Sequence, residues 1–140
     1  MSIVKIEIES PASEERIGEL HNNLASAGQA LREDEFETFL LKVVGQDGKM
    51  IAGCKGEIAF RSAHISELWV DESHRGQGLG RKLLGYAERH AKAQHCIRVH
   101  LETRNSKARE LYEHLGYAVF GSLPDYEGSN AFYYLEKRLA

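Results

Sequence analysis

The residues with the clearest chemical purpose are three glycines in the stretch Arg75–Gly80, which reads RGQGLG. They lie where a helix is predicted to begin, although glycine in a helix costs roughly 1 kcal/mol relative to alanine. The unpaired backbone N–H groups at a helix N-terminus, together with the helix dipole, favour an anion. Glycines, which lack β-carbons, would let a phosphate group come close to these N–H groups. The stretch therefore predicts a phosphate-binding loop.

Three known patterns of phosphate-binding loop compete for this stretch. A Walker loop would need Gly-Lys-Ser/Thr at its end, but the last glycine is followed by Arg-Lys. A dinucleotide fingerprint that starts at Gly76 would place Arg81 at its third glycine position. The pattern that fits is Arg-x-x-Gly-x-Gly, formed by Arg75, Gly78 and Gly80.

The elements around the loop predict an α/β domain with a mixed sheet. Alternation of apolar and polar residues predicts strands, and apolar residues at helical spacing predict helices. We expect a strand at Ile3–Glu9, a helix at Ala12–Ala25, a short helix in the charged segment REDEFE, strands at Thr38–Gly45, Met50–Phe60 and Ala63–Val70, a helix from the glycines to about Gln94, a strand at Ile97–Thr103, a helix from Asn105 to Gly116, and strands at Tyr117–Ser122 and Ala131–Lys137.

Length and composition indicate one ordinary globular domain over residues 1–140, with 42% hydrophobic and 28% charged residues. The net charge of -3 weighs against nucleic acid or an anionic membrane as a partner, because phosphate binding usually needs a basic surplus. The charged residues Lys5 and Glu7 interrupt the region where a signal peptide would be apolar, so we expect a cytoplasmic protein. Cys54 and Cys96 are isolated and predict neither a disulfide framework nor a metal site.

Two segments resemble the GCN5-related N-acetyltransferase (GNAT) superfamily. The segment ELWVDESHRGQGLGRKLL is similar to the family's acetyl-CoA-binding signature, and NSKARELYEHLGY is similar to its second characteristic segment. The C-terminal segment VFGSLPDY and the order of the elements are also similar to those of small bacterial members. The resemblance implies a mixed, mostly antiparallel sheet of about seven strands, flanked by helices and splayed to admit acetyl-CoA.

The resemblance also implies which residues bind the cofactor. Backbone N–H groups would hold the pyrophosphate along the run Arg75, Gly76, Gln77, Gly78, Leu79 and Gly80. The pantetheine arm would pair, like an added strand, with the backbone of Leu68, Trp69 and Val70. Asn105 would contact the arm and Tyr112 would point its hydroxyl at the thioester sulfur. Simpler roles stay open, because Asn105 can cap a helix and Tyr112 fits an apolar helix face.

Transfer of an acetyl group to an amine also needs a base, since a lysine-like amine with a pKa of about 10.4 is protonated at neutral pH. Glu67 is the first candidate, because it lies on the strand that leads into the loop. Strict alternation would place it on one face with Ile65 and Trp69, where an apolar surface would raise its pKa. His64 and Glu102 are the fallback bases, and an ordinary surface role for Glu67 stays open.

The predicted activity is acetyl-CoA-dependent N-acetylation of a primary amine, of a small molecule or a peptide, by direct attack in a ternary complex without a metal. A homodimer is compatible with this. The alternative is a non-catalytic module that binds coenzyme A as a ligand or sensor. The acidic residues Asp125 and Glu127, in a predicted loop, indicate either a cationic acceptor or ordinary solvated charge.

Overall fold

The structure is a computed structural model that describes residues 4–140 and divides by its contacts into two compact units, residues 1–35 and 36–140. The first unit contains helix α1 (Glu14–Ser26) and the 3-10 turn η1 (Glu33–Glu35).

Helix α1 begins after Ser13, whose hydroxyl accepts the Arg16 N–H as an N-cap. The predicted helix at Ala12–Ala25 is confirmed, and the short helix predicted in REDEFE is this 3-10 turn. The prediction of one domain over residues 1–140 stays a prediction.

The strand predicted at Ile3–Glu9 is wrong for the part of it that the structure describes. Ile3 lies outside the described residues, and residues 4–9 have no regular secondary structure. Their apolar side chains are almost fully exposed, with Val4 at 84%, Ile6 at 93% and Ile8 at 91%. Alternation identifies a segment suited to a strand, but a strand also needs a partner for its backbone hydrogen bonds, which alternation does not supply.

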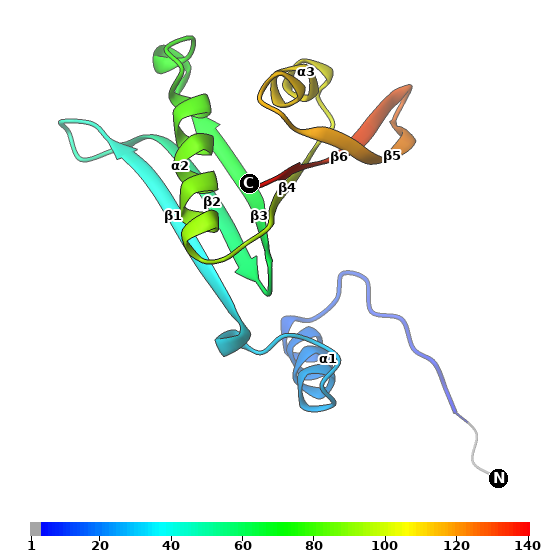
Figure 1. Ribbon diagram of the computed structural model, residues 1–140. Helices are drawn as coiled ribbons and strands as arrows, with labels where there is room; N and C mark the ends of the chain where they lie inside the picture. Colours follow the sequence, from blue (N-terminus) through cyan, green and yellow to red (C-terminus); the bar gives the residue numbers. More distant parts are fainter. Residues whose placement is uncertain (1–3) are drawn as a thin grey trace. The chain divides into compact units, whose positions relative to one another are not determined.

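The second unit is a six-stranded sheet with helices α2 and α3 (Figure 1). Its elements are β1 (Phe36–Val44), β2 (Met50–Ala59), β3 (Ser62–Val70), η2 (Glu72–His74), α2 (Leu79–Ala93), β4 (Arg98–Thr103), α3 (Ser106–His114), β5 (Ala118–Glu127) and β6 (Asn130–Arg138). The strand order is β1-β2-β3-β4-β6-β5, and every pair is antiparallel except β3 with β4. The mixed, mostly antiparallel sheet is thus confirmed, with six strands among the described residues rather than about seven.

The core of this unit lies between one face of the sheet and α2 (Figure 1). Helix α2 buries Leu83, Leu84, Ala87 and Ala91, which recur at the spacing of one helical face. The largest fully buried side chains are Leu84, Leu135, Val99 and Cys54. Burying a leucine side chain contributes roughly 1.5–3 kcal/mol, so this packing fixes α2, and the loop before it, against the sheet.

The parallel strands β3 and β4 separate along their length. Their pairing is limited to Ser62 with Arg98, Ala63 with Val99 and His64 with His100. Beyond His64, β3 continues to Val70 and β4 to Thr103 without pairing to each other. The predicted splay is therefore confirmed, and it starts directly after the pair of His64 and His100.

Candidate active site

The glycine loop lies between the end of β3 and the first turn of α2. Gly78 is the N-cap residue of α2, with a φ of 79°, and in the described chain no side chain caps this helix end. The 15 residues of α2 therefore direct their positive dipole end and first N–H groups at the loop. The Arg75 side chain fastens the loop to β3, because its Nε donates to the Val70 carbonyl at 3.0 Å. The backbone N–H of Arg75 is already used, since it donates to the Glu72 carbonyl at 3.3 Å.

The three glycines of the loop are not equivalent. Gly76 and Gly78 both have a φ of 79°, in the left-handed region that other residues rarely adopt. A β-carbon on either would meet no atom within 4 Å, so the space beside them is open. A β-carbon on Gly80, in contrast, would lie in ordinary contact with Val70 Cγ2 at 3.7 Å. The backbone thus favours glycine at Gly76 and Gly78 but not at Gly80.

The last residues of β3 present one free backbone edge towards the splay. Leu68, Trp69 and Val70 pair with β2 on one side, and on the other side β4 has already diverged. The side chains of Leu68 and Val70 pack against the core, which holds this edge in place. An extended ligand could add to such an edge as a strand does.

Asn105 and Tyr112 lie on α3, as predicted. Asn105 is the N-cap of α3, because its Oδ1 accepts the N–H groups of Lys107 at 2.9 Å and Ala108 at 3.1 Å. Tyr112 packs against the core, with its ring 6.0 Å from that of Tyr117. Burial raises the pKa of Tyr112 above its usual value, so the hydroxyl keeps its proton at neutral pH. The cofactor contact of Asn105 and the acid role of Tyr112 stay predictions.

The predicted environment of Glu67 is wrong for Ile65 and right for Trp69. Strand β3 contains a bulge, since Lys55 pairs with Glu67 while the next residue, Gly56, pairs with Ile65. The extra residue shifts the alternation, so Ile65 is buried in the core and Glu67 lies on the opposite face with Trp69. The Glu67 side chain is 74% exposed, and its carboxylate lies 4.0 Å from the Lys55 ammonium. Glu67 therefore lacks Ile65 as a neighbour but shares a pocket with the apolar side chains of Leu40, Met50 and Trp69, while its role as the base stays a prediction.

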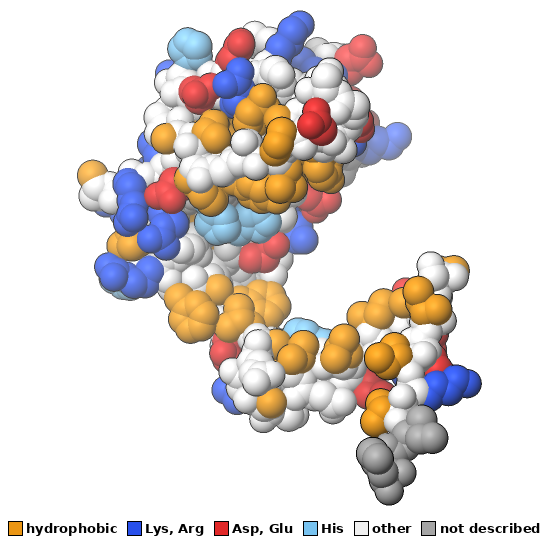
Figure 2. Space-filling view, turned by 90° about the vertical axis from the view of Figure 1, so that its right-hand side faces the viewer, with side chains coloured by type: hydrophobic (Ala, Val, Ile, Leu, Met, Phe, Trp, Pro, Cys, Tyr) orange, Lys and Arg blue, Asp and Glu red, His pale blue; other side chains and the backbone are white. Residues whose placement is uncertain are grey.

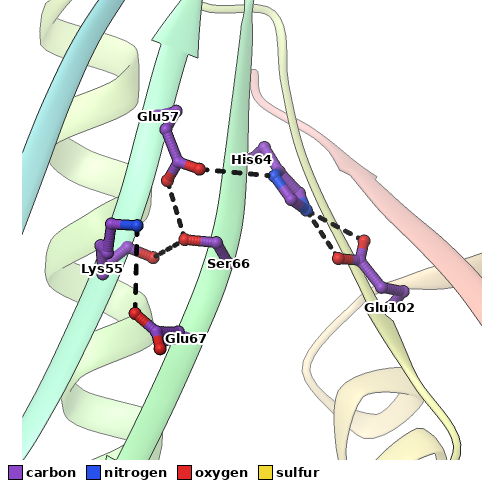
Figure 3. A network of polar contacts seen from close by, with 6 residues as sticks. All are labelled: Lys55, Glu57, His64, Ser66, Glu67 and Glu102. Carbon is purple, nitrogen blue, oxygen red and sulfur yellow. Dashed lines mark hydrogen bonds and ion pairs between the residues drawn. The ribbon is translucent and has the colours of Figure 1, made fainter. Parts of the chain in front are cut away.

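A polar network occupies the sheet face away from α2, where the splay begins (Figure 3). His64 Nε2 lies 2.8 and 3.0 Å from the two carboxylate oxygens of Glu102. On its other side, His64 Nδ1 lies 4.0 Å from Glu57 Oε1. The Ser66 hydroxyl donates to Glu57 Oε2 at 2.8 Å. The two fallback bases are thus brought together.

Sequence reasoning missed Glu57 in this network. Glu57 pairs with His64 across β2 and β3, so it follows from the hairpin once the register is known. The two-residue turn at 60–61 sets that register, because Ala59 pairs with Ser62 and the pairs continue unbroken to Gly56 with Ile65, before the bulge at Ser66. Register, rather than residue type, is the signal that would have found Glu57.

Aromatic side chains of β5 and β6 lie next to this network. Their ring centroids are 4.7 Å apart for Tyr126 and Phe132, 5.1 Å for Phe132 and Tyr134, and 6.2 Å for Phe120 and Tyr134. Tyr134 pairs with Glu102 in the register of β4 and β6. Figure 2 shows hydrophobic side chains gathered beside histidine and acidic side chains on this side of the unit.

The two acidic residues predicted to lie in a loop near the C-terminus lie in a strand instead. Asp125 and Glu127 belong to strand β5, so the loop prediction is wrong there. Glu127 forms an exposed ion pair with Arg104 at 3.0 Å. This ion pair gives Glu127 an ordinary surface role.

Neither cysteine is prepared for nucleophilic chemistry. Cys54 and Cys96 are both buried, and burial raises the pKa of the Cys54 thiol to about 11. The pKa of Cys96 is also raised, first by burial and then by the nearby Glu37 carboxylate. A reactive cysteine needs a lowered pKa, because the thiolate is the nucleophile.

Residues 4–140 contain neither a cluster suited to a metal ion nor a helix suited to span a membrane. No cluster of three or more His, Cys, Asp or Glu side chains in this range is arranged to hold a metal ion. Within the same range, every helix is too short or too polar to span a membrane.

The model of the acetyltransferase (GNAT) family matches residues 3–117. The chain belongs to this family. It is 33% identical over 104 residues to the blasticidin-S acetyltransferase of Streptomyces morookaense, which covers 74% of this chain and 76% of that protein.

Solved structures resemble nearly the whole of this acetyltransferase. The crystal structure of an acetyltransferase from Bacillus cereus superimposes with a TM-score of 0.82 at 29% identity, over 97% of this chain and 98% of the other. An aminoglycoside 6'-N-acetyltransferase in complex with coenzyme A shares the fold, with a TM-score of 0.64 at 18% identity over 73% of each chain. The chain is therefore a GNAT-fold acetyltransferase.

Proposed function

We propose that this acetyltransferase moves the acetyl group of acetyl-CoA to a primary amine, in a ternary complex. The observation that carries the proposal is the splay between β3 and β4, which has the glycine loop at the end of β3 and titratable groups on both faces of the sheet. Tyr112 lies on the side of α2 and α3, while His64 and Glu102 lie on the face away from α2.

Acetyl-CoA would bind along the loop and the free edge of β3. The pyrophosphate would lie against the N–H groups of Gly76–Gly80 and the N-terminus of α2. Arg81 and Lys82 follow directly and add positive charge. The pantetheine arm would pair with Leu68–Val70, which would bring the thioester into the splay near Tyr112.

Direct attack by the amine fits the side chains better than an acyl-enzyme does. Covalent transfer would need a nucleophile, and the burial of Cys54 and Cys96 keeps both thiols protonated. A protonated Tyr112, in contrast, is suited to give its proton to the departing thiolate of coenzyme A.

The acceptor would approach from the face away from α2, where the carboxylates of Glu57, Glu67 and Glu102 favour a cationic amine. The rings of Phe132 and Tyr134 next to Glu102 would suit an apolar or flat portion of the acceptor. The Streptomyces relative is named for blasticidin S, which makes blasticidin S the first acceptor to test.

The test is a panel of amines that contains blasticidin S, aminoglycosides, polyamines and short peptides with a free N-terminus or lysine. Each is incubated with acetyl-CoA and the protein, while free thiol and the acetylated amine are measured in parallel. We expect thiol release that matches an N-acetylated product for at least one amine. Thiol release without acetylated amine would contradict amine transfer, and binding of coenzyme A without turnover across the panel would favour the non-catalytic module.

A further inference from the structure

We infer that His64 is the general base that takes the proton from the acceptor amine, that Glu102 positions it, and that Glu57 binds the incoming ammonium group. This inference rests on the proposed function. It replaces Glu67, the first candidate from the sequence, with a residue whose partners the structure places around it.

The position of His64 suits a base for this reaction. His64 and His100 are the last pair before β3 and β4 diverge, so the imidazole lies at the opening of the splay. Its neighbours in β3, Ala63 and Ile65, are buried on the side of α2, so His64 points to the opposite face. A base there and Tyr112 on the side of α2 would act on opposite sides of one thioester, the first on the attacking amine and the second on the leaving sulfur.

The Glu102 carboxylate selects one tautomer of His64. A carboxylate can only accept, so the close contact of Nε2 with both Glu102 oxygens, at 2.8 and 3.0 Å, places the single proton of the neutral ring on Nε2. The lone pair is then on Nδ1, which points to the other side of the ring. The same carboxylate stabilises the imidazolium that forms when Nδ1 takes a proton.

The space beside Nδ1 is bounded by a second carboxylate. Glu57 Oε1 lies 4.0 Å from Nδ1. This is too far for a direct hydrogen bond, so the two atoms do not bond to each other. Ser66 holds Glu57 in place through the other carboxylate oxygen, at 2.8 Å. An ammonium group has three N–H donors, and can therefore donate to Glu57 and to Nδ1 at the same time.

Other charged groups around His64 define its electrostatic setting. His100 stacks on His64 with ring centroids 4.9 Å apart. The pKa of His100 is lowered, first by burial and then by His64, which favours the neutral form of His100. The charged or titratable groups that face the two rings from β2, β4 and β6 are Glu57, Arg98, His100, Glu102 and Glu136.

Glu67 lacks these features. Its side chain is 74% exposed, and its carboxylate lies 4.0 Å from the Lys55 ammonium. Glu102 holds His64 at 2.8 Å, whereas such a loose, exposed ion pair does little to fix the position of Glu67.

His64 Nδ1 takes one proton from the ammonium nitrogen, whose lone pair then forms the bond to the acetyl carbonyl carbon. The carbon–sulfur bond breaks with its electron pair going to sulfur, and the sulfur takes a proton from Tyr112 or water. The nitrogen loses its second proton to solvent. His64 then gives up its proton to solvent and Tyr112 regains one, so the overall reaction releases one proton.

The test compares three variants of the full chain with the best acceptor from the panel. His64→Gln removes the base, Glu67→Gln removes the competing candidate, and His90→Gln is the matched control. His90 is also a histidine paired with a carboxylate, since its Nε2 lies 2.9 Å from Glu37, but it belongs to α2 and not to the splay. Coenzyme A affinity and thermal unfolding verify that each variant is folded.

We expect His64→Gln to lower kcat/KM by about 100-fold, the lower end for general base catalysis, and to change how the rate depends on pH. Coenzyme A affinity should stay the same, and His90→Gln should match the wild type. A normal rate and pH profile in folded His64→Gln, or the large loss in Glu67→Gln instead, would overturn the inference. If the wild type acetylates no amine, the proposed function itself has failed.

A second pair of measurements tests the positioning roles and covers the case in which His64→Gln is unstable. Imidazole added to His64→Ala should restore part of the rate, because it replaces only the missing base. Glu102→Gln should lower kcat and shift the pH profile, whereas Glu57→Gln should mainly raise KM for the amine. Absence of rescue in a folded variant, or identical effects of the two glutamine substitutions on kcat and KM, would contradict these roles.

Discussion

The glycine loop and the proposed acceptor face represent two ways of building a site. The loop, Arg75–Gly80, is one continuous segment whose geometry comes from its own backbone and from the end of one helix. The acceptor face combines Glu57, His64 and Glu102, which belong to three strands and lie up to 45 residues apart in the chain (102 − 57 = 45). A local site depends on backbone conformation, while a dispersed site depends on strand register, and substitutions can test the two separately.

The strongest test of the loop is Gly78→Val. We expect coenzyme A affinity to fall by about 100-fold, because a non-glycine residue at a φ of 79° adds strain of roughly 1–3 kcal/mol and the new side chain fills the open space for the phosphate. Gly80→Ala should have a smaller effect, since its β-carbon would make only an ordinary contact with Val70. Calorimetric titration of folded variants measures both, and equal losses for the two would contradict the distinction between these glycines.

Tyr112→Phe tests the leaving-group side of the splay. We expect a fall of about 100-fold in single-turnover acetyl transfer at saturating acetyl-CoA, with the fold and cofactor affinity retained. The raised pKa of Tyr112 places any loss of its proton at high pH, so the difference from wild type should persist through neutral pH. If the variant reacts at the wild-type rate at every pH, Tyr112 contributes to packing and is not the acid.

Arg75→Ala tests whether the loop recognises phosphate through charge as well as through backbone. We expect acetyl-CoA to bind about tenfold more weakly. A hydrogen bond to a charged group contributes roughly 1.5–3 kcal/mol, and solvent screening at this exposed site reduces that contribution. Acetylpantetheine, which lacks the pyrophosphate, should lose less. Equal losses for both ligands would mean that Arg75 acts by fastening the loop to the Val70 carbonyl.

Tyr117→Phe is the matched control for Tyr112, since it is a second buried tyrosine on the same side of the sheet. The Tyr117 hydroxyl donates to Glu88 at 2.8 Å, so its loss should lower the free energy of unfolding by about 1 kcal/mol without changing the rate of acetyl transfer. Denaturant unfolding and the transfer assay together measure this. A rate loss as large as that of Tyr112→Phe would undermine the specific role of Tyr112.

The same tyrosine predicts how stability depends on pH. Burial, and then the Glu88 carboxylate, raise the pKa of Tyr117 above its value of about 10 in the unfolded chain. A group with a raised pKa in the folded state stabilises the fold below the unfolded pKa, and this stabilisation is lost as the pH rises above it. We therefore expect the wild type to lose stability above pH 10 more steeply than Tyr117→Phe does.

The sequence predicted the helices and strands of the second unit closely, but it predicted a strand in the first unit that the structure lacks. Helix α2 was predicted from Leu79 to about Gln94 and ends at Ala93, because its buried face recurs at helical spacing over four turns. The segment Ile3–Glu9 alternates just as clearly, but its described part forms no strand. Periodicity reports which side chains a local conformation would place on one face, and it carries no information on the partner that must complete a sheet.

By itself, the sequence determined the family, the glycine loop and the helix that follows it, since all three depend on residues close together in the chain. Only the tertiary structure decided which residues meet on the face away from α2. One extra residue at Ser66 moved Glu67 away from the face of Ile65, and the register between β2 and β3 placed Glu57 opposite His64. Side chains in a strand alternate with a period of two, so a shift of one residue reverses the faces, and this shift is fixed by long-range pairing rather than by local residue types.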